Sequence, residues 1–167
     1  MKSINTIFYG ILKFLGIWAI PLLLPIVNAK VNWLSPNELL ILGGILLLGC
    51  YIGSVKYFVA EITGWKKEIW VTSLIVLIMS VLLIFISSRY ILPGTFGTSS
   101  PTVLPWNQFY ITTIIFTTVG FGDFVPLSIG AQYFTCALAL LGVTHAIVTF
   151  SIVISRLRDE TPKYWRV

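Results

Sequence analysis

Charge is scarce in this chain: only 10% of its 167 residues are charged, whereas about a quarter of the residues in a soluble domain are. Hydrophobic residues make up 57%, and the mean hydropathy is positive. So few charges cannot solvate the surface of a folded chain, which excludes an ordinary soluble domain and indicates a membrane protein. The net charge of +5 then bears on orientation in a bilayer, and no nucleic-acid partner is expected.

Reactive groups are equally sparse. The two cysteines, Cys50 and Cys136, each lie inside an apolar run, which argues against a disulfide scaffold and favours packing roles. No paired carboxylates, nucleophile with an adjacent base or cluster of metal ligands converges in the sequence. An enzyme and an organic cofactor are therefore not expected.

Long apolar stretches are the main positive signal. Four of them could cross about 30 Å of hydrocarbon as helices, namely residues 8–28, 39–60, 71–92 and 128–155. The first is the weakest, because Lys13 and two prolines interrupt it, so an interfacial helix leading into a short kinked span is an alternative. The sequence predicts an all-α membrane protein with four transmembrane helices.

Lysine and arginine are distributed unevenly around these stretches. Lys30 and Arg89 fall on one side of a four-span arrangement. The other side carries Lys2, Lys13, Lys56, Lys66, Lys67, Arg156, Arg158, Lys163 and Arg166. Because basic residues favour the cytoplasmic side, we expect a multi-pass protein of the cell membrane with both termini cytoplasmic. Lys66 and Lys67 are expected to anchor this topology, with binding of anionic membrane lipids as the alternative.

A different pattern separates the third and fourth stretches. Residues 93–101 are rich in proline, glycine and hydroxyl side chains, which is typical of an exposed loop. Pro105 and Trp106 then fit the start of a helix over 106–117, which at about 18 Å is too short to cross a bilayer. Lipid cannot satisfy irregular backbone, so a re-entrant element of this kind must be walled by protein or face water. The chain therefore predicts an internal cavity.

Directly after this short helix comes the run Thr118-Val119-Gly120-Phe121-Gly122-Asp123. Its two glycines reach positive φ values that other residues avoid, which allows successive carbonyls to turn toward one axis. Placed after a short helix and between two apolar spans, the run closely resembles the signature of tetrameric potassium channels. The resemblance extends from Pro105 to about Arg158. A phosphate-binding loop is the rival interpretation, but the Gly-Lys-Ser/Thr ending is missing.

The resemblance implies a homotetramer in which each chain supplies a quarter of the pore. The K+ sites would be formed by carbonyls of Thr118, Val119, Gly120 and Phe121 with the Thr118 hydroxyl, and Gly122 would complete the filter. K+ is then a permeant ligand. Asp123 would lie at the outer mouth, either in a ring of carboxylates that attracts cations or as an acceptor for Tyr110 or Trp106.

Two departures from the commonest family pattern concern the surroundings of the filter. Phe121 stands where many members carry tyrosine, and Ile111 stands where the partner of that hydroxyl is expected, so the changes are mutually consistent. Val119 and Phe121 are expected to pack behind the filter, with Phe121 against Ile111. Ile114 and Ile115 also replace polar residues of some members. We hypothesise that such a filter inactivates more readily.

The last apolar stretch resembles the pore-lining helix of the family. Its residues Val143, Ala146, Phe150 and Ile154 share one helical face, which by resemblance would line the cavity and form an apolar gate, with ordinary helix packing as the alternative. Gly142 stands at the expected hinge, with a close helix contact as the alternative. His145, the only histidine, is expected to be neutral and hydrogen-bonded to a neighbouring helix or to pore-helix threonines, rather than to sense protons.

These patterns divide the chain into three parts. Residues 1–70 hold two transmembrane helices and a cytoplasmic linker, and 159–167 form a short cytoplasmic tail. Residues 71–158 form a pore module with an outer helix 71–92, a pore helix 106–117, a filter 118–123 and an inner helix 128–155. The expected function is passive potassium-selective conduction. A nonselective cation channel and a non-conducting accessory subunit are the alternatives.

Overall fold

The computed structural model describes residues 4–63, 69–98 and 105–160, and the side chains within them from residue 16 onward except 56–63, 69–75, 98, 105–106, 156 and 159–160. The described chain is helical apart from two short strands, which confirms the predicted all-helical class. In order, the elements are α1 (Ile4–Val31), α2 (Pro36–Thr63), α3 (Ile69–Ser88), β1 (Phe96–Thr98), α4 (Pro105–Phe116), β2 (Phe124–Pro126) and α5 (Ile129–Glu160).

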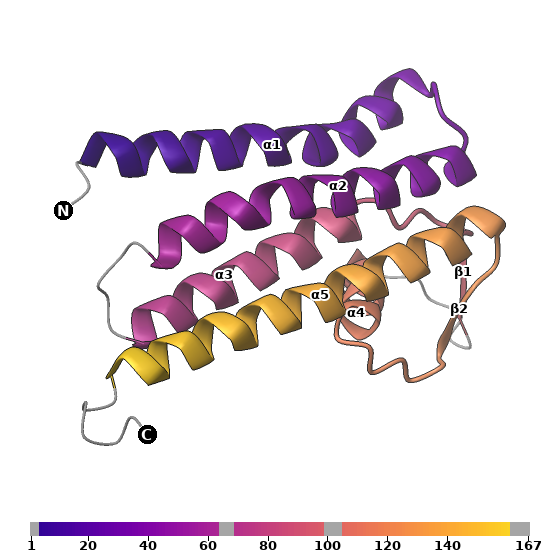
Figure 1. The fold of residues 1–167 in the computed structure, drawn as a ribbon. Coiled ribbons are helices and arrows are strands. Elements are labelled where there is room, and N and C mark those ends of the chain that lie inside the picture. Colours follow the sequence, from indigo (N-terminus) through magenta and orange to yellow (C-terminus); the bar gives the residue numbers. More distant parts are fainter. Residues whose placement is uncertain (1–3, 64–68, 99–104, 161–167) are drawn as a thin grey trace.

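The four long helices lie side by side, and the short α4 lies at one end of the bundle near α3 and α5 (Figure 1). The two strands lie at that same end, whereas α1 begins and α5 ends at the opposite end (Figure 1). α2 and α5 run in the same direction. The third helix is shorter than the predicted stretch 71–92, because the backbone of Arg89 and Tyr90 bonds back to Ile86 and Ser87 in tight turns that end α3 at Ser88.

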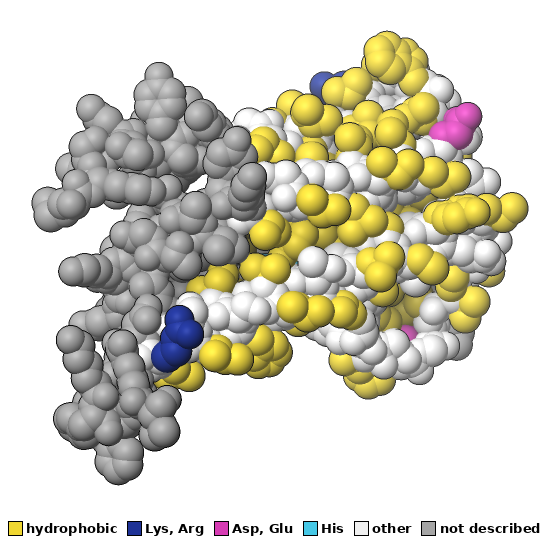
Figure 2. Space-filling model, in the orientation of Figure 1, with side chains coloured by type: hydrophobic (Ala, Val, Ile, Leu, Met, Phe, Trp, Pro, Cys, Tyr) yellow, Lys and Arg dark blue, Asp and Glu magenta, His cyan; other side chains and the backbone are white. Residues whose placement is uncertain are grey.

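Two helices among the described residues are long and apolar enough to cross a membrane: Pro36–Val55 within α2 and Ile129–Ser155 within α5. The apolar parts of α1 and α3 found there are shorter, Gly16–Val31 and Val76–Ser88. Hydrophobic side chains run along the helices over the face drawn in Figure 2, and the few charged ones lie toward the helix ends. Ile45, for example, is 64% exposed at mid-helix. A surface of this kind suits lipid better than water.

The α2 and α5 helices pack closely because small residues face each other along their contact. A side chain at Gly130 would collide with the backbone of Asn37, and one at Gly44 would press on Ala137. The third contact is Tyr51, whose hydroxyl lies 3.1 Å from the His145 ring. These contacts recur at about every seventh residue, as expected for two parallel helices that stay in register. The first half of α2 therefore packs along the first half of α5.

Two prolines dock α1 onto the rest of the bundle. A proline inside a helix has no N–H, so the carbonyl four residues earlier loses its donor. Pro21 frees the carbonyl of Ile17, which accepts a bond from the Cys50 thiol at 3.5 Å. Pro25 frees the carbonyl of Pro21, which accepts a bond from the buried Tyr90 hydroxyl at 2.7 Å. Neighbouring helices thus supply the donors that the prolines remove, as an apolar medium requires.

The Tyr90 hydroxyl is expected to contribute measurably to stability. Tyr90→Phe leaves the Pro21 carbonyl buried without its donor, and we expect the free energy of unfolding to fall by roughly 1 kcal/mol. Thermal unfolding in detergent measures this, with Tyr133→Phe as the matched control because that ring is 62% exposed on α5. Equal losses in both variants would show that the Pro21 carbonyl does not depend on Tyr90.

The predicted exposed loop 93–101 is partly wrong. Thr95 and Phe96 are buried, and β1 pairs antiparallel with β2, with Phe96 opposite Pro126. The Leu127 amide extends this ladder by donating to the Thr95 carbonyl at 3.0 Å. Local composition pointed to turns, but pairing with a segment nearly thirty residues later decided the outcome. The small sheet ties the chain after residue 123 to the chain before α4.

Candidate functional site

The end of α4 passes directly into the predicted filter. α4 ends at Phe116, one residue before the predicted end, and its last carbonyls accept bonds from the first filter amides. The Ile114 carbonyl accepts from Val119 at 3.0 Å and from Gly120 at 3.3 Å, and the Ile115 carbonyl accepts from Thr118 at 3.0 Å. These bonds occupy carbonyls that a helix end leaves without donors, and they fix where the filter begins.

Within the filter the sign of φ alternates. Thr118 has φ 59°, Gly120 has φ 52° and Gly122 has φ 79°, whereas Val119 and Phe121 do not adopt positive values. In an ordinary strand successive carbonyls point to opposite sides, and a left-handed residue at every second position rotates them toward the same side. The two glycines behave as predicted. Thr118 was not expected in this conformation, which costs a residue with a Cβ about 1–2 kcal/mol.

The filter side chains do not pack within their own chain as expected. Val119 is 55% exposed and Phe121 is 69% exposed. Ile111, the expected partner of Phe121, is buried in the core of its own chain with α3 and α5. A contact behind the filter therefore requires a surface from outside a single chain.

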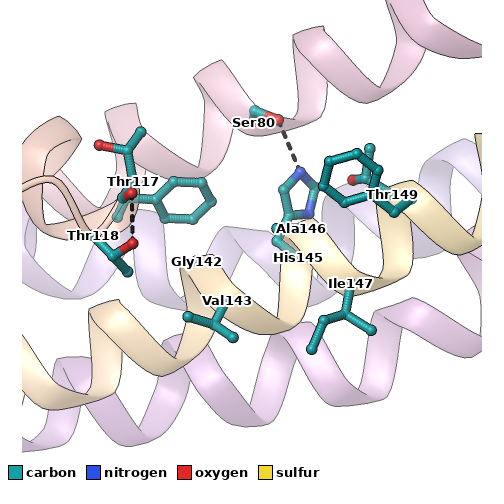
Figure 3. A pocket seen from close by; sticks show the side chains of 11 residues that line it. Ser80, Thr117, Thr118, Gly142, Val143, His145, Ala146, Ile147 and Thr149 are labelled. Carbon is teal, nitrogen blue, oxygen red and sulfur yellow. Dashed lines mark hydrogen bonds between the residues drawn. The ribbon is translucent and has the colours of Figure 1, made fainter.

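A hollow of about 530 Å³ lies below the filter, between the end of α4 and the middle of α5. Its lining includes Thr117 and Thr118 together with three predicted cavity residues, Val143, Ala146 and Phe150. Figure 3 shows the α5 side chains around it, with Val143 and Ile147 projecting from the same side of the helix. Ile154 is 63% exposed further along α5 and does not line the hollow. The role of this face as a gate stays a prediction.

Gly142 is where α4 and α5 touch. A Cβ built on Gly142 would collide with the carbonyl oxygen of Phe116, the last residue of α4. Glycine is therefore required here by close approach of another backbone, which is the alternative to a hinge that the sequence left open. The negative end of the α4 dipole consequently lies against α5 at the top of the hollow, where it favours a cation.

His145 lies just beyond this contact and is buried, with one hydrogen bond at each ring nitrogen. Its Nδ1 is 3.1 Å from the Tyr51 hydroxyl of α2, and its Nε2 is 2.8 Å from the Ser80 hydroxyl of α3. The expected bonding to neighbouring helices is thus present. The sequence analysis did not single out Tyr51 and Ser80. Both are polar residues inside apolar stretches, and this pattern could have identified them as partners of a histidine in another membrane helix.

At the other end of the filter, Asp123 is half-buried between α4 and β2. A hydrogen bond to its carboxylate raises the pKa of the Tyr110 phenol. The Tyr110 ring also meets Phe124 edge to face at 5.8 Å. The Trp106 side chain lies outside the described residues, and among those described the Asp123 Oδ1 is buried without a hydrogen-bond partner. The first residues after the filter are thus held against α4.

The described residues thus place the predicted filter directly after α4, with its first residue, Thr118, at the hollow that α5 also lines. A family model described as an ion channel matches residues 71–159, more than half of the chain. No curated protein and no solved structure matches. The matched range holds α3, α4 and α5 with the filter between them. The chain belongs to the family of two-transmembrane pore-loop ion channels, which includes potassium channels.

Proposed function

We propose that this ion channel subunit conducts K+ selectively and passively through a tetramer. The observation that carries the proposal is the alternating backbone at Thr118, Gly120 and Gly122, directly after a short helix. To pass selectively, K+ exchanges its hydration water for oxygens at close range, and a column of carbonyls directed to one side supplies them. Carbonyls of residues 118–121 and the Thr118 hydroxyl would take the ion, with Gly122 and Asp123 beyond them.

The exposed filter supports a tetramer. One chain leaves Val119 and Phe121 more than half exposed, on backbone that is neither helix nor sheet. At membrane depth such backbone persists only when protein surrounds it or water faces it. Four copies around one axis meet both conditions, with carbonyls toward the ions and side chains toward the neighbouring copy. Four α4 ends would then direct their negative dipoles into one shared cavity.

The proposed membrane arrangement has α1, α2, α3 and α5 as spans and α4 as the re-entrant element. Figure 1 is consistent with it, because α1 begins and α5 ends at one end of the bundle while the filter lies at the other. Lys30 and Arg89 lie at the filter end, whereas Lys56 of α2 and Arg158 of α5 lie near the opposite ends of their helices. With basic residues inside, both termini would be cytoplasmic and the filter would face outward.

Purified protein in liposomes tests the function. The reversal potential is measured under opposing K+ and Na+ gradients, with Gly120→Ala as the control for flux through the filter. We expect a reversal potential close to that of K+, abolished in the variant. Equal permeability to both ions would instead identify a nonselective channel of this architecture, and absence of current over a range of voltage and pH would favour an accessory subunit.

Tyr110→Phe separates the two roles of Asp123. The variant removes a donor to the carboxylate but keeps its charge, so a bracing role predicts current that decays roughly threefold faster or more, at unchanged unitary conductance. Single-channel recording in low salt measures both quantities, and Tyr133→Phe on the exposed side of α5 is the control. Unchanged decay, together with a conductance that falls in Asp123→Asn, would favour the cation-attracting ring.

A further inference from the structure

Three side chains from three helices form one hydrogen-bonded chain inside the bundle. They are Tyr51 of α2, His145 of α5 and Ser80 of α3. Tyr51 and His145 are each 5% exposed, and Ser80 is half-buried. The imidazole also meets the Tyr51 ring edge to face at 5.7 Å and the Phe116 ring of α4 at 5.8 Å. His145 thus contacts α3 and α4 of the pore module and also α2.

The direction of each bond follows from the hydroxyl of Ser80. That hydroxyl donates to the Val76 carbonyl at 2.9 Å, so toward His145 it acts as an acceptor. With the Ser80 proton on the Val76 carbonyl, Nε2 carries the ring proton, and the unprotonated Nδ1 accepts from the Tyr51 hydroxyl. Each of the three donors, the Tyr51 hydroxyl, Nε2–H and the Ser80 hydroxyl, then has one acceptor, with the imidazole neutral. In apolar surroundings such a fully paired set holds its geometry, because each broken bond leaves a buried polar group.

The hydrogen-bonded set of Tyr51, His145 and Ser80 is anchored to α5 at the hollow. His145 follows Gly142 by three residues, and it lines the hollow together with Val143, Ala146 and its partner Ser80. Figure 3 shows the His145 ring pointing toward Ser80 while Val143 projects from the other side of α5. A rotation of α5 that changed how Val143 and Ala146 face the hollow would pull the ring away from both partners.

We propose that His145 is a positioning residue for conduction: with Tyr51 and Ser80 it holds α5 in the orientation that faces Val143 and Ala146 into the hollow, and so couples α2 to the open–closed equilibrium of the pore. The role rests on the proposed function. It gives α2, which lies outside the matched range 71–159, a role in the pore. In this scheme His145 acts through the orientation of α5, and selectivity stays with the filter.

A double-mutant cycle in single-channel recordings tests the coupling. Tyr51→Phe removes one hydroxyl and keeps the ring, and we expect the open–closed ratio to change about threefold or more, the average worth of such a bond between membrane helices. In a His145→Leu background the same change should have no effect, because Tyr51 acts only through the imidazole. The reversal potential should be the same throughout. Ser151→Ala, which removes an exposed hydroxyl bonded only within α5, is the control.

Equal effects of Tyr51→Phe in both backgrounds, or none in either, would overturn the proposal. A second measurement tests the hydrogen bonds of His145 without recording current. Because His145 is the only histidine, nitrogen-15 labelling of histidine gives one pair of ring signals, and we expect the neutral Nε2–H form with a shift of Nδ1 in Tyr51→Phe. An Nδ1 signal that does not change in Tyr51→Phe would overturn the proposal even in a conducting channel. A wild type with the expected signals but no current would instead overturn the proposed function, and the conducting role with it.

Discussion

Gly120→Ala is expected to abolish K+ flux while the protein still folds and assembles. Gly120 has φ 52°, a conformation that costs a residue with a Cβ roughly 1–2 kcal/mol, and the tetramer would contain four copies. No atom lies within 4 Å of a Cβ built there in a single chain, so the penalty comes from the backbone itself. The strained peptide can relieve this cost by rotating, which turns a carbonyl away from the ion path.

The matched control is Gly49→Ala, because a Cβ at Gly49 also has open space but lies in α2. There alanine is preferred over glycine by about 1 kcal/mol, so flux should persist and stability should rise slightly. Potassium efflux from liposomes at equal protein content measures the difference, and chromatography in detergent checks assembly. Flux through Gly120→Ala near the wild-type rate would show that the left-handed backbone at this position is not needed for conduction.

Gly142→Ala is expected to separate α4 from α5. The new Cβ would collide with the Phe116 carbonyl oxygen, and backbone cannot move aside as the end of a side chain can. Overpacking of this kind costs about 1–3 kcal/mol, and here it displaces the end of α4, whose carbonyls accept from the first filter amides. We therefore expect a lower melting temperature together with a loss of conduction or selectivity.

Gly53→Ala is the control for this variant, since Gly53 is also helical and a Cβ there meets nothing within 4 Å. Thermal unfolding and reversal potential are measured on both proteins. The comparison also tests the hinge. If Gly142 served only to let α5 bend, alanine would stabilise the helix, raise the melting temperature and alter gating at unchanged selectivity. That result would contradict a required close contact.

Much of this architecture can be predicted from the sequence, because its strongest signals are local. Apolar length alone locates α1, α2, α3 and α5, since a helix satisfies its own backbone and needs only the right solvent outside. The position of α4 and of the filter follows from a run of six residues between two such lengths. Positive φ at Gly120 and Gly122 follows as well, because no other residue type adopts it at so little cost.

Contacts between distant segments were decided only by the tertiary structure. The sequence shows that Pro21 and Pro25 free two carbonyls, but it does not show that Cys50 and Tyr90 supply the donors. It also predicts an exposed loop where β1 pairs with β2, because neither strand has a pattern of its own until the other lies beside it. In each case one partner is far away in the chain, and propensity carries no information about it.

The same distinction applies to the residues around the pore. The sequence determined that His145 lies in a membrane span and needs polar partners, because an unpaired imidazole is costly there. Which partners it has, and hence which ring nitrogen carries the proton, depended on the rotation of α2 and α3 against α5. For Gly142 the sequence left hinge and contact equally open, and the approach of the Phe116 carbonyl gave the contact a physical basis. Periodicity determines which residues share a face, whereas only packing in three dimensions decides what that face meets.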